Sequence, residues 1–301
     1  MRRRQDSATG RTPGAQGHAG RAAPPLEELV ERARNGDARA LDEVVRAIKD
    51  DVFGLAVRML WHPEDAEDAT QEILMKVVTH LATWRGESAF RTWVYRVATN
   101  HLLNTRKSRV ERGELTFSAF GAELAEHLSD PPAPVADGPE QRLLEEEVKI
   151  GCTQGMLLCL DREHRVAYVL GEVFELRSEE AAYVVGVEPA TFRKRLSRAR
   201  ERVRAFMSEH CGLVNAAVPC RCARRVEYAV AVGRVDLGRL LFAGRPGRAR
   251  LALPVVGQVE EMEDLHRAAG VFRSHPEYDA PERLVGAVRQ LIESGRFTLL
   301  Q

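Results

Sequence analysis

The sequence predicts an all-α protein: two small helical domains joined by a flexible linker and followed by a helical C-terminal extension. Hydrophobic residues make up 44% of the chain and aromatic residues only 6%, a composition that favours helices. Apolar residues recur at helical spacing on both sides of a proline-rich stretch, SDPPAPVADGPE at 129–140. We therefore expect a disordered arm at 1–25, a first domain at 26–109, a linker at 110–140, a second domain at 141–207 and an extension at 208–301.

The overall composition limits the function classes. The chain has 44 basic and 44 acidic residues and a formal net charge of zero, so any affinity for nucleic acid must come from segregated charge. No apolar run approaches the roughly 20 residues that span a bilayer, and no secretory signal is recognisable. Five cysteines do not suggest a disulfide framework. A reducing cytoplasm is the predicted location.

An acidic motif begins a helix of the first domain. The run DAEDATQE at 65–72 follows Pro63, and its acids suit the positive end of a helix dipole. The same acids form a negative surface that a basic protein partner could recognise. We predict a protein-binding face here.

Aromatic and basic residues alternate in the next segment, RGESAFRTWVYRVATNHLLNTRKSR at 85–109. This combination suits melted DNA, whose bases stack on aromatic rings or enter pockets while cations hold the phosphates. Trp93 and Val97 are expected in the core. Ser88, Phe90 and the arginines are expected at the surface.

Two short helices joined by a tight turn are predicted at 178–204. Gly186 suits the turn because it tolerates positive φ, and Pro189 suits the first turn of the second helix. That helix has an apolar stripe and, on its remaining arc, seven basic residues against Glu201. This pattern is typical of a helix-turn-helix whose second helix enters a major groove. The stripe comprises Phe192, Leu196, Ala199 and Val203.

These three motifs, in this order, resemble a bacterial RNA polymerase sigma factor of the sigma-70 family, of the extracytoplasmic-function (ECF) type. The resemblance covers about residues 26–207 and implies that the protein is not an enzyme. It implies core RNA polymerase, through its β′ clamp helices and β flap, and promoter DNA as partners, with an anti-sigma factor as a further candidate. The polymerase-binding residues would be Asp65, Asp68, Gln71 and Glu72.

The resemblance also assigns the DNA-binding residues. Those for the −10 promoter element would be Arg85, Ser88, Phe90, Arg96, Asn100, Arg106 and Lys107. Those for the −35 element would be Pro189, Thr191, Arg193, Lys194, Ser197, Arg198 and Arg202. The acidic linker between the two domains would either follow a path shared with RNA or act as a simple tether.

The extension has cysteines but no clear site. His210, Cys211, Cys220 and Cys222 could supply zinc ligands, although the Cys-x-Cys spacing is tighter than usual. Nearby arginines would lower the pKa of a thiol, so a redox switch is the second possibility. Cysteines with a purely structural role are the third. No cofactor is otherwise expected. Helices are predicted at 224–232, 237–242, 259–272 and 281–294, with a regulatory role for the extension.

Two other functions compete with transcription initiation. A self-standing DNA-binding regulator could sense metal or redox state through its cysteines without polymerase. An enzyme housed in the extension would need a nucleophile and a base, and none is recognisable. The acidic and aromatic-basic motifs favour the sigma factor, because a simple repressor needs neither.

Overall fold

The computed structural model describes residues 24–105, 111, 115–130, 134–243 and 264–293, and no strand occurs among them. The predicted all-α class is confirmed. None of the described helices has both the length and the apolar composition needed to cross a membrane.

The first domain is a bundle of four helices. In chain order these are α1 (Leu26–Arg34), α2 (Ala38–Leu60), α3 (Pro63–Thr79) and α4 (Phe90–Asn104), with a 3₁₀ turn, η1 (Leu81–Thr83), before α4. Asp37 caps α2, because its side chain accepts the free N–H groups of Arg39 and Ala40 at 3.0 Å each. Pro63 begins α3, where a missing N–H has no cost.

The second domain contains the helix-turn-helix. Its elements are α7 (Gly138–Leu158), α8 (Arg162–Tyr168), the π-helical turn η2 (Val169–Val173), α9 (Ser178–Val185) and α10 (Pro189–His210). Gly186 has φ 70° and ψ 37°, the left-handed conformation that the turn between α9 and α10 requires. The predicted apolar stripe of α10 is fully in the core: the exposed fractions of Phe192, Ala199 and Val203 are 0% and that of Leu196 is 5%.

The predicted linker contains more structure than its composition suggests. Helix α6 (Phe117–Glu126) forms within it and is capped by Thr116, which accepts the N–H of Ala119 at 3.1 Å. Phe120 and Leu124 are buried, and Phe120 stacks on Phe206 of α10 at 5.5 Å between ring centroids. The linker segment is therefore anchored to the second domain.

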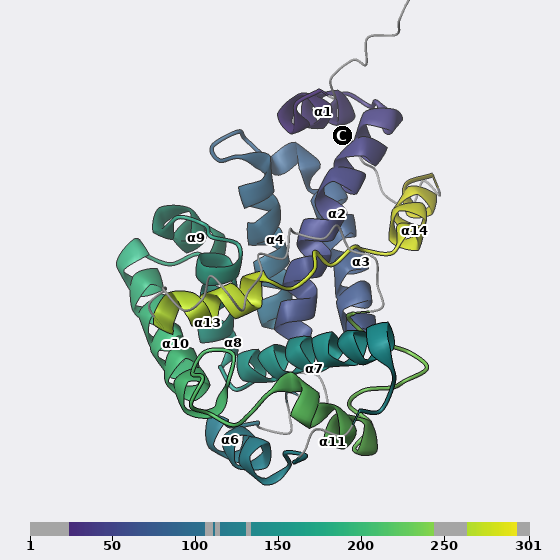
Figure 1. The fold of residues 1–301 in the computed structure, drawn as a ribbon. Helices are drawn as coiled ribbons and strands as arrows, with labels where there is room; N and C mark the ends of the chain where they lie inside the picture. The colour runs from purple at the N-terminus through teal and green to yellow at the C-terminus, as the bar shows by residue number, and fades with distance from the viewer. Residues whose placement is uncertain (1–23, 106–110, 112–114, 131–133, 244–263, 294–301) are drawn as a thin grey trace, which may run out of the picture.

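The extension wraps around both domains (Figure 1). It contains η3 (Cys222–Arg225), α11 (Val226–Ala231), α13 (Asp264–Arg273) and α14 (Glu282–Glu293). Helix α13 packs on α10, whereas α14 packs on α2 and α3. The predicted helix at 237–242 is wrong, because the carboxylate of Glu147 accepts the backbone N–H groups of residues 241–243 that a helix would use.

One continuous apolar core joins the two domains and the extension. It includes Phe53 and Ile73 of the first domain, Tyr168 of the second, and Phe272 and Leu284 of the extension. Because burial of apolar side chains is the main stabilising term, the described parts of the chain hold one another in this arrangement.

Candidate polymerase and nucleic-acid interfaces

The acidic face of α3 is exposed. Asp65, Asp68 and Glu72 lie at the surface, and Gln71 is half-buried beside them. The opposite face of the helix is in the core, with Ala66, Ile73 and Leu74 at 0% exposure. Helical spacing thus separates the two faces as the sequence predicts, and the negative surface is available to a partner.

A groove of about 920 Å³ runs between α3 and α4. The three acids of α3 line one wall, and polar side chains of α4 line the other. The groove therefore brings the predicted polymerase-binding acids next to predicted −10 residues, a proximity that the sequence did not show. Its lining includes Asp65, Asp68, Glu72, Lys76, Trp93, Arg96, Asn100, His101 and Asn104.

A lysine–histidine contact crosses this groove. The Nζ of Lys76 lies 2.7 Å from the Nδ1 of His101, and Glu72 lies 3.7 Å from Nε2 of the same ring. Burial, with the nearby charge of Lys76 as a second cause, lowers the pKa of His101. The imidazole is therefore neutral at pH 7 and accepts a hydrogen bond from the ammonium.

The predicted −10 residues have different environments. Arg85 and Asn100 are exposed, Ser88 is half-buried, and Arg106 and Lys107 lie outside the described residues. The expected exposure of Phe90 is wrong: its side chain is at 0% exposure.

Phe90 is buried because two tryptophans enclose it. Its ring centroid lies 5.5 Å from that of Trp84 and 5.6 Å from that of Trp93. An aromatic residue at a helix start therefore serves here as core, and the exposed part of the −10 surface is polar.

Helix α9 covers part of α4. The guanidinium of Arg96 donates to the backbone carbonyl of Tyr183 at 2.9 Å and lies over the ring of Tyr183, 4.5 Å from its centroid. Thr92 donates to the carboxylate of Glu180 at 2.5 Å. A predicted DNA-binding arginine of the first domain is thus engaged with the second domain.

Helix α10 presents an open basic face. Thr191, Arg193, Lys194, Ser197 and Arg198 are exposed, and Pro189 is half-buried at the first turn. Within the described part of the chain, Lys194 and Arg198 form no ion pair. These two cations can approach a phosphate backbone without first breaking an ion pair, whereas Arg193 pairs with Glu179 at 3.6 Å.

Other basic residues of α10 are internally compensated. Arg195 pairs with Glu163 at 2.7 Å and Arg204 with Glu201 at 2.8 Å. Arg200 donates its Nε to Glu172 at 2.6 Å. Arg202 is exposed but lies over the Phe117 ring and donates to the carbonyl of Cys159 at 3.2 Å. The cations available to DNA are therefore concentrated in the first half of the helix.

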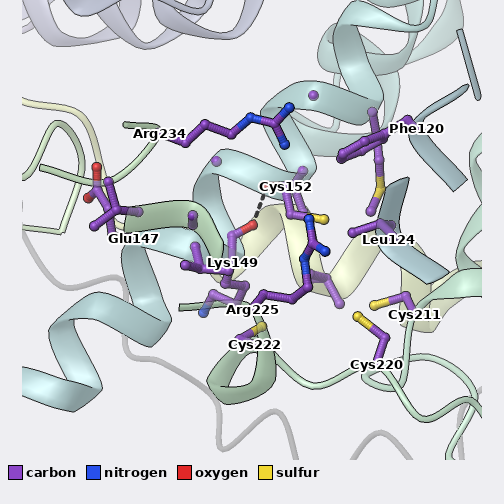
Figure 2. Close-up of a pocket in the computed structure, with 18 of the residues that line it drawn as sticks. Phe120, Leu124, Glu147, Lys149, Cys152, Cys211, Cys220, Cys222, Arg225 and Arg234 are labelled. Atoms are coloured by element: carbon purple, nitrogen blue, oxygen red, sulfur yellow. Dashed lines mark hydrogen bonds between the residues drawn. The ribbon is translucent and has the colours of Figure 1, made fainter. Parts of the chain in front are cut away.

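The cysteines of the extension lie near one another but form no metal centre. Cys211, Cys220 and Cys222, together with Cys152 of α7, line one cavity (Figure 2). Among the described residues, no three His, Cys, Asp or Glu side chains are arranged to hold a metal ion. His210 instead packs on the ring of Phe206, at 4.8 Å between centroids.

The expected low thiol pKa is also wrong. Burial raises the pKa of Cys211 and Cys220, and it raises the pKa of Cys222 to about 12. The neighbouring arginines bind elsewhere: Arg225 pairs with Glu123 at 3.0 Å, and Arg224 donates to the carbonyl of Ser129 at 2.8 Å. These thiols are neutral groups in an apolar setting.

Comparison with known proteins identifies the family. The family described as Sigma-70 region 2 matches residues 44–111, which hold α3, its groove and α4. The RNA polymerase sigma-H factor of Pseudomonas aeruginosa is 34% identical over 178 residues, covering 59% of this chain and 91% of the relative. The ECF RNA polymerase sigma-E factor of Haemophilus influenzae is 32% identical over 181 residues, covering 59% of this chain and 92% of the relative.

The chain belongs to the ECF RNA polymerase sigma factors. This confirms the resemblance stated from the sequence and does not favour a self-standing regulator. A solved structure of the sigma factor RpoE in complex with the anti-sigma factor NepR from Bartonella quintana is 18% identical, with a TM-score of 0.37. It covers 55% of this chain and 95% of that chain, a level of likeness that adds nothing to the assignment.

Proposed function

We propose that this sigma factor binds core RNA polymerase through the acidic face of α3 and reads promoter DNA with α4 and α10. The exposed acids Asp65, Asp68 and Glu72 suit a basic surface of the polymerase. The open half of α10 suits the duplex −35 element, and the polar residues of α4 suit the melted −10 element. The protein contributes positioning and strand separation, and the polymerase performs the chemistry.

The single observation that carries this proposal is the separation of charge on the two elements. A chain of zero net charge has acids exposed along one helix and unpaired cations exposed along another. One surface then meets protein and the other meets phosphates, as an initiation factor requires.

The two DNA-binding domains are held together directly. Arg162 of α8 donates to the carbonyls of Leu102 and Leu103 at 3.0 and 3.3 Å, at the C-terminal end of α4 where a cation is favourable. Buried Glu111 pairs with Arg162 at 2.6 Å and with Arg165 at 2.8 Å. These bonds join the second domain to the last turn of the −10 helix.

Tyr278 of the extension bridges the same two domains. Its ring lies under the guanidinium of Arg58 on α2, 4.6 Å from the centroid, and its hydroxyl accepts from Gln154 of α7 at 3.2 Å. The neighbouring His275 lies 2.9 Å from Thr153 of α7. Because these groups are buried, each hydrogen bond would leave an unsatisfied polar atom if it opened.

Polar contacts continue along the first domain. The N–H of Ala280 donates to Asp50 at 2.8 Å, and its carbonyl accepts from Lys49 at 3.2 Å. Arg283 of α14 pairs with Glu67 of α3. The extension therefore crosses from α7 to α2 and then to the helix that carries the acidic face.

This closed arrangement cannot read a promoter. The −10 and −35 elements are separated by roughly 25 base pairs, or about 85 Å at the rise of B-DNA. Two domains whose reading helices are joined through α9 cannot reach both. The extension and the direct contacts thus hold an inactive form, and initiation requires the domains to separate. The proposed role of the extension is inhibition.

The test of polymerase binding uses two matched variants. Asp68 on α3 and Glu126 on α6 are both exposed acids. Asp68→Arg should abolish co-purification with bacterial core polymerase and run-off transcription, while Glu126→Arg should retain both. Equal co-purification of the two variants would contradict the assignment of α3.

Location and partners follow from this role. We propose that the sigma factor works in the cytoplasm, where the polymerase is, with core polymerase and promoter DNA as partners. An anti-sigma factor remains a prediction from the family resemblance.

A further inference from the structure

A cavity of about 290 Å³ lies where the extension meets α6 and α7. Figure 2 shows its walls: Phe120 and Leu124 from α6, Cys152 from α7, and Cys220 and Cys222 from the extension. An apolar cavity of about 150 Å³ can hold a benzene ring, so this one has room for a larger aromatic molecule. It lies away from the polymerase and DNA surfaces described above.

The walls are mainly apolar. Aromatic and aliphatic side chains enclose the space, and the four thiols add neutral, polarisable surface because burial raises the pKa of each. Such a lining favours the apolar body of a ligand. The apolar members include Phe120, Leu124, Val148, Met156, Leu213, Phe242 and Val271.

The charges of the lining are unbalanced toward positive. Its one carboxylate, Glu147, is saturated by the backbone N–H groups of Leu241, Phe242 and Ala243 at 2.8, 2.9 and 2.7 Å. Arg225 and Arg234 share a single carboxylate, that of Glu123, and Arg225 also donates to the backbone carbonyls of Glu123 and His127.

A third guanidinium has no carboxylate at all. Arg221 donates to backbone carbonyls, among them that of Ala216 at 3.0 Å, and forms no ion pair among the described residues. Three guanidiniums therefore line the apolar space beside one shared carboxylate, and Arg221 and Arg234 among them are exposed.

We propose that this cavity binds a small apolar molecule that carries one anionic group, an aromatic carboxylate or sulfonate by chemical class. The body would fill the apolar space, and the anion would take donors from the exposed Arg221 and Arg234, because charge-assisted hydrogen bonds are the strong ones. Nothing in the sigma-factor activity itself needs this site.

The ligand would act on the closed form. The cavity exists only while the extension is docked, since α6, α7 and the extension each supply a wall. A ligand that binds the docked form stabilises it by mass action. If the extension inhibits as proposed above, a ligand that holds the extension in place would lower transcription.

The test uses a pair of probes and the full-length chain. 8-Anilinonaphthalene-1-sulfonate is an apolar anion, and N-phenyl-1-naphthylamine is nearly the same molecule without the sulfonate. Fluorescence titration should give saturable one-to-one binding of the anion and about tenfold weaker binding of the neutral probe. Equal affinities would overturn the assigned role of the arginines.

A cavity-filling variant locates the probe. Gly151 on α7 lines the cavity, and a Cβ added there meets no atom within 4 Å. Gly151→Leu therefore adds side-chain volume at the cavity wall, where its Cβ has room, and also removes the helix penalty of glycine. Gly286 on α14 is equally open and lies elsewhere, so Gly286→Leu is the matched control.

The outcomes separate this inference from the proposed function. Gly151→Leu should lower the affinity for the anionic probe at least tenfold, and Gly286→Leu should not change it. Unchanged probe binding in Gly151→Leu, or binding of several probes per chain, would overturn the site. The titration needs neither polymerase nor DNA, so its failure leaves the transcription tests of the sigma role intact.

Discussion

The two helices proposed to read promoter DNA, α4 and α10, differ in what covers them. Helix α10 exposes Lys194 and Arg198, which form no internal ion pair within the described residues. Helix α4 has Arg96 bound to Tyr183 of α9. The difference shows that only one of the two proposed DNA surfaces is available in this form of the molecule.

The helix-turn-helix itself produces this asymmetry. Its first helix, α9, packs on α4, while its second helix, α10, faces outward. Covering the proposed −10 surface therefore leaves the proposed −35 surface free. A sigma factor closed in this way should still touch duplex DNA but should not open it.

The direct contact between the domains can be broken at Glu111. Its side chain is 3% exposed and pairs with both Arg162 and Arg165. Glu111→Gln leaves two guanidiniums without their counter-charge, and we expect a loss of about 3–5 kcal/mol of unfolding free energy. Denaturant unfolding measures it.

The control for this variant is an exposed ion pair. Glu163 is 60% exposed in its pair with Arg195, so Glu163→Gln should cost at most about 1 kcal/mol. Equal losses in the two variants would contradict a buried network between the domains.

The reactivity of the Cys222 thiol reports whether the extension is docked. Burial raises the pKa of this thiol to about 12 from a reference of 9.0, which leaves about 1,000-fold less thiolate at any pH below 9. Alkylation with iodoacetamide at pH 8, followed by mass spectrometry, should therefore be far slower in the native chain than in guanidinium chloride. Similar rates in both would show that the extension is not docked.

The open and covered surfaces should differ in salt dependence. Arg198→Ala should reduce the slope of log affinity for a −35 duplex against log salt by about 0.9, because one phosphate contact is lost. Arg96→Ala should leave the corresponding slope for a duplex that carries the −10 element unchanged in the full chain, since Arg96 is bound to α9. An equal effect of both substitutions would contradict the comparison.

Local features of this fold could be predicted from the sequence. The turn at Gly186 and the stripe through Phe192 and Leu196 each depend on residues that are close together in the sequence. The structure has both in the predicted places. A signal for α6 was also present, since Thr116 can cap a helix and Phe117, Phe120 and Leu124 share one face. The proline-rich stretch that follows α6 led to the prediction of a linker for the whole segment.

Contacts between distant segments could not be predicted. Phe90 has the same sequence pattern whether it faces solvent or two tryptophans. Ala280 and Asp50 are 230 positions apart, and an amphipathic α14 does not identify the helix it covers. The thiol pKa was predicted with the wrong sign because sequence proximity placed arginines near Cys220, whereas burial decides the shift.

If the extension holds the sigma factor closed, as we propose, removing the Tyr278 ring should open it. Run-off transcription with core polymerase should compare the full-length wild type, Tyr278→Ala, and Phe117→Ala, which removes an aromatic ring of α6 that packs on Phe206 of α10 rather than on the extension. We predict several-fold more transcript with Tyr278→Ala and no such gain with Phe117→Ala. A Tyr278→Ala protein that keeps its helical circular dichroism but transcribes no more than wild type would contradict the account.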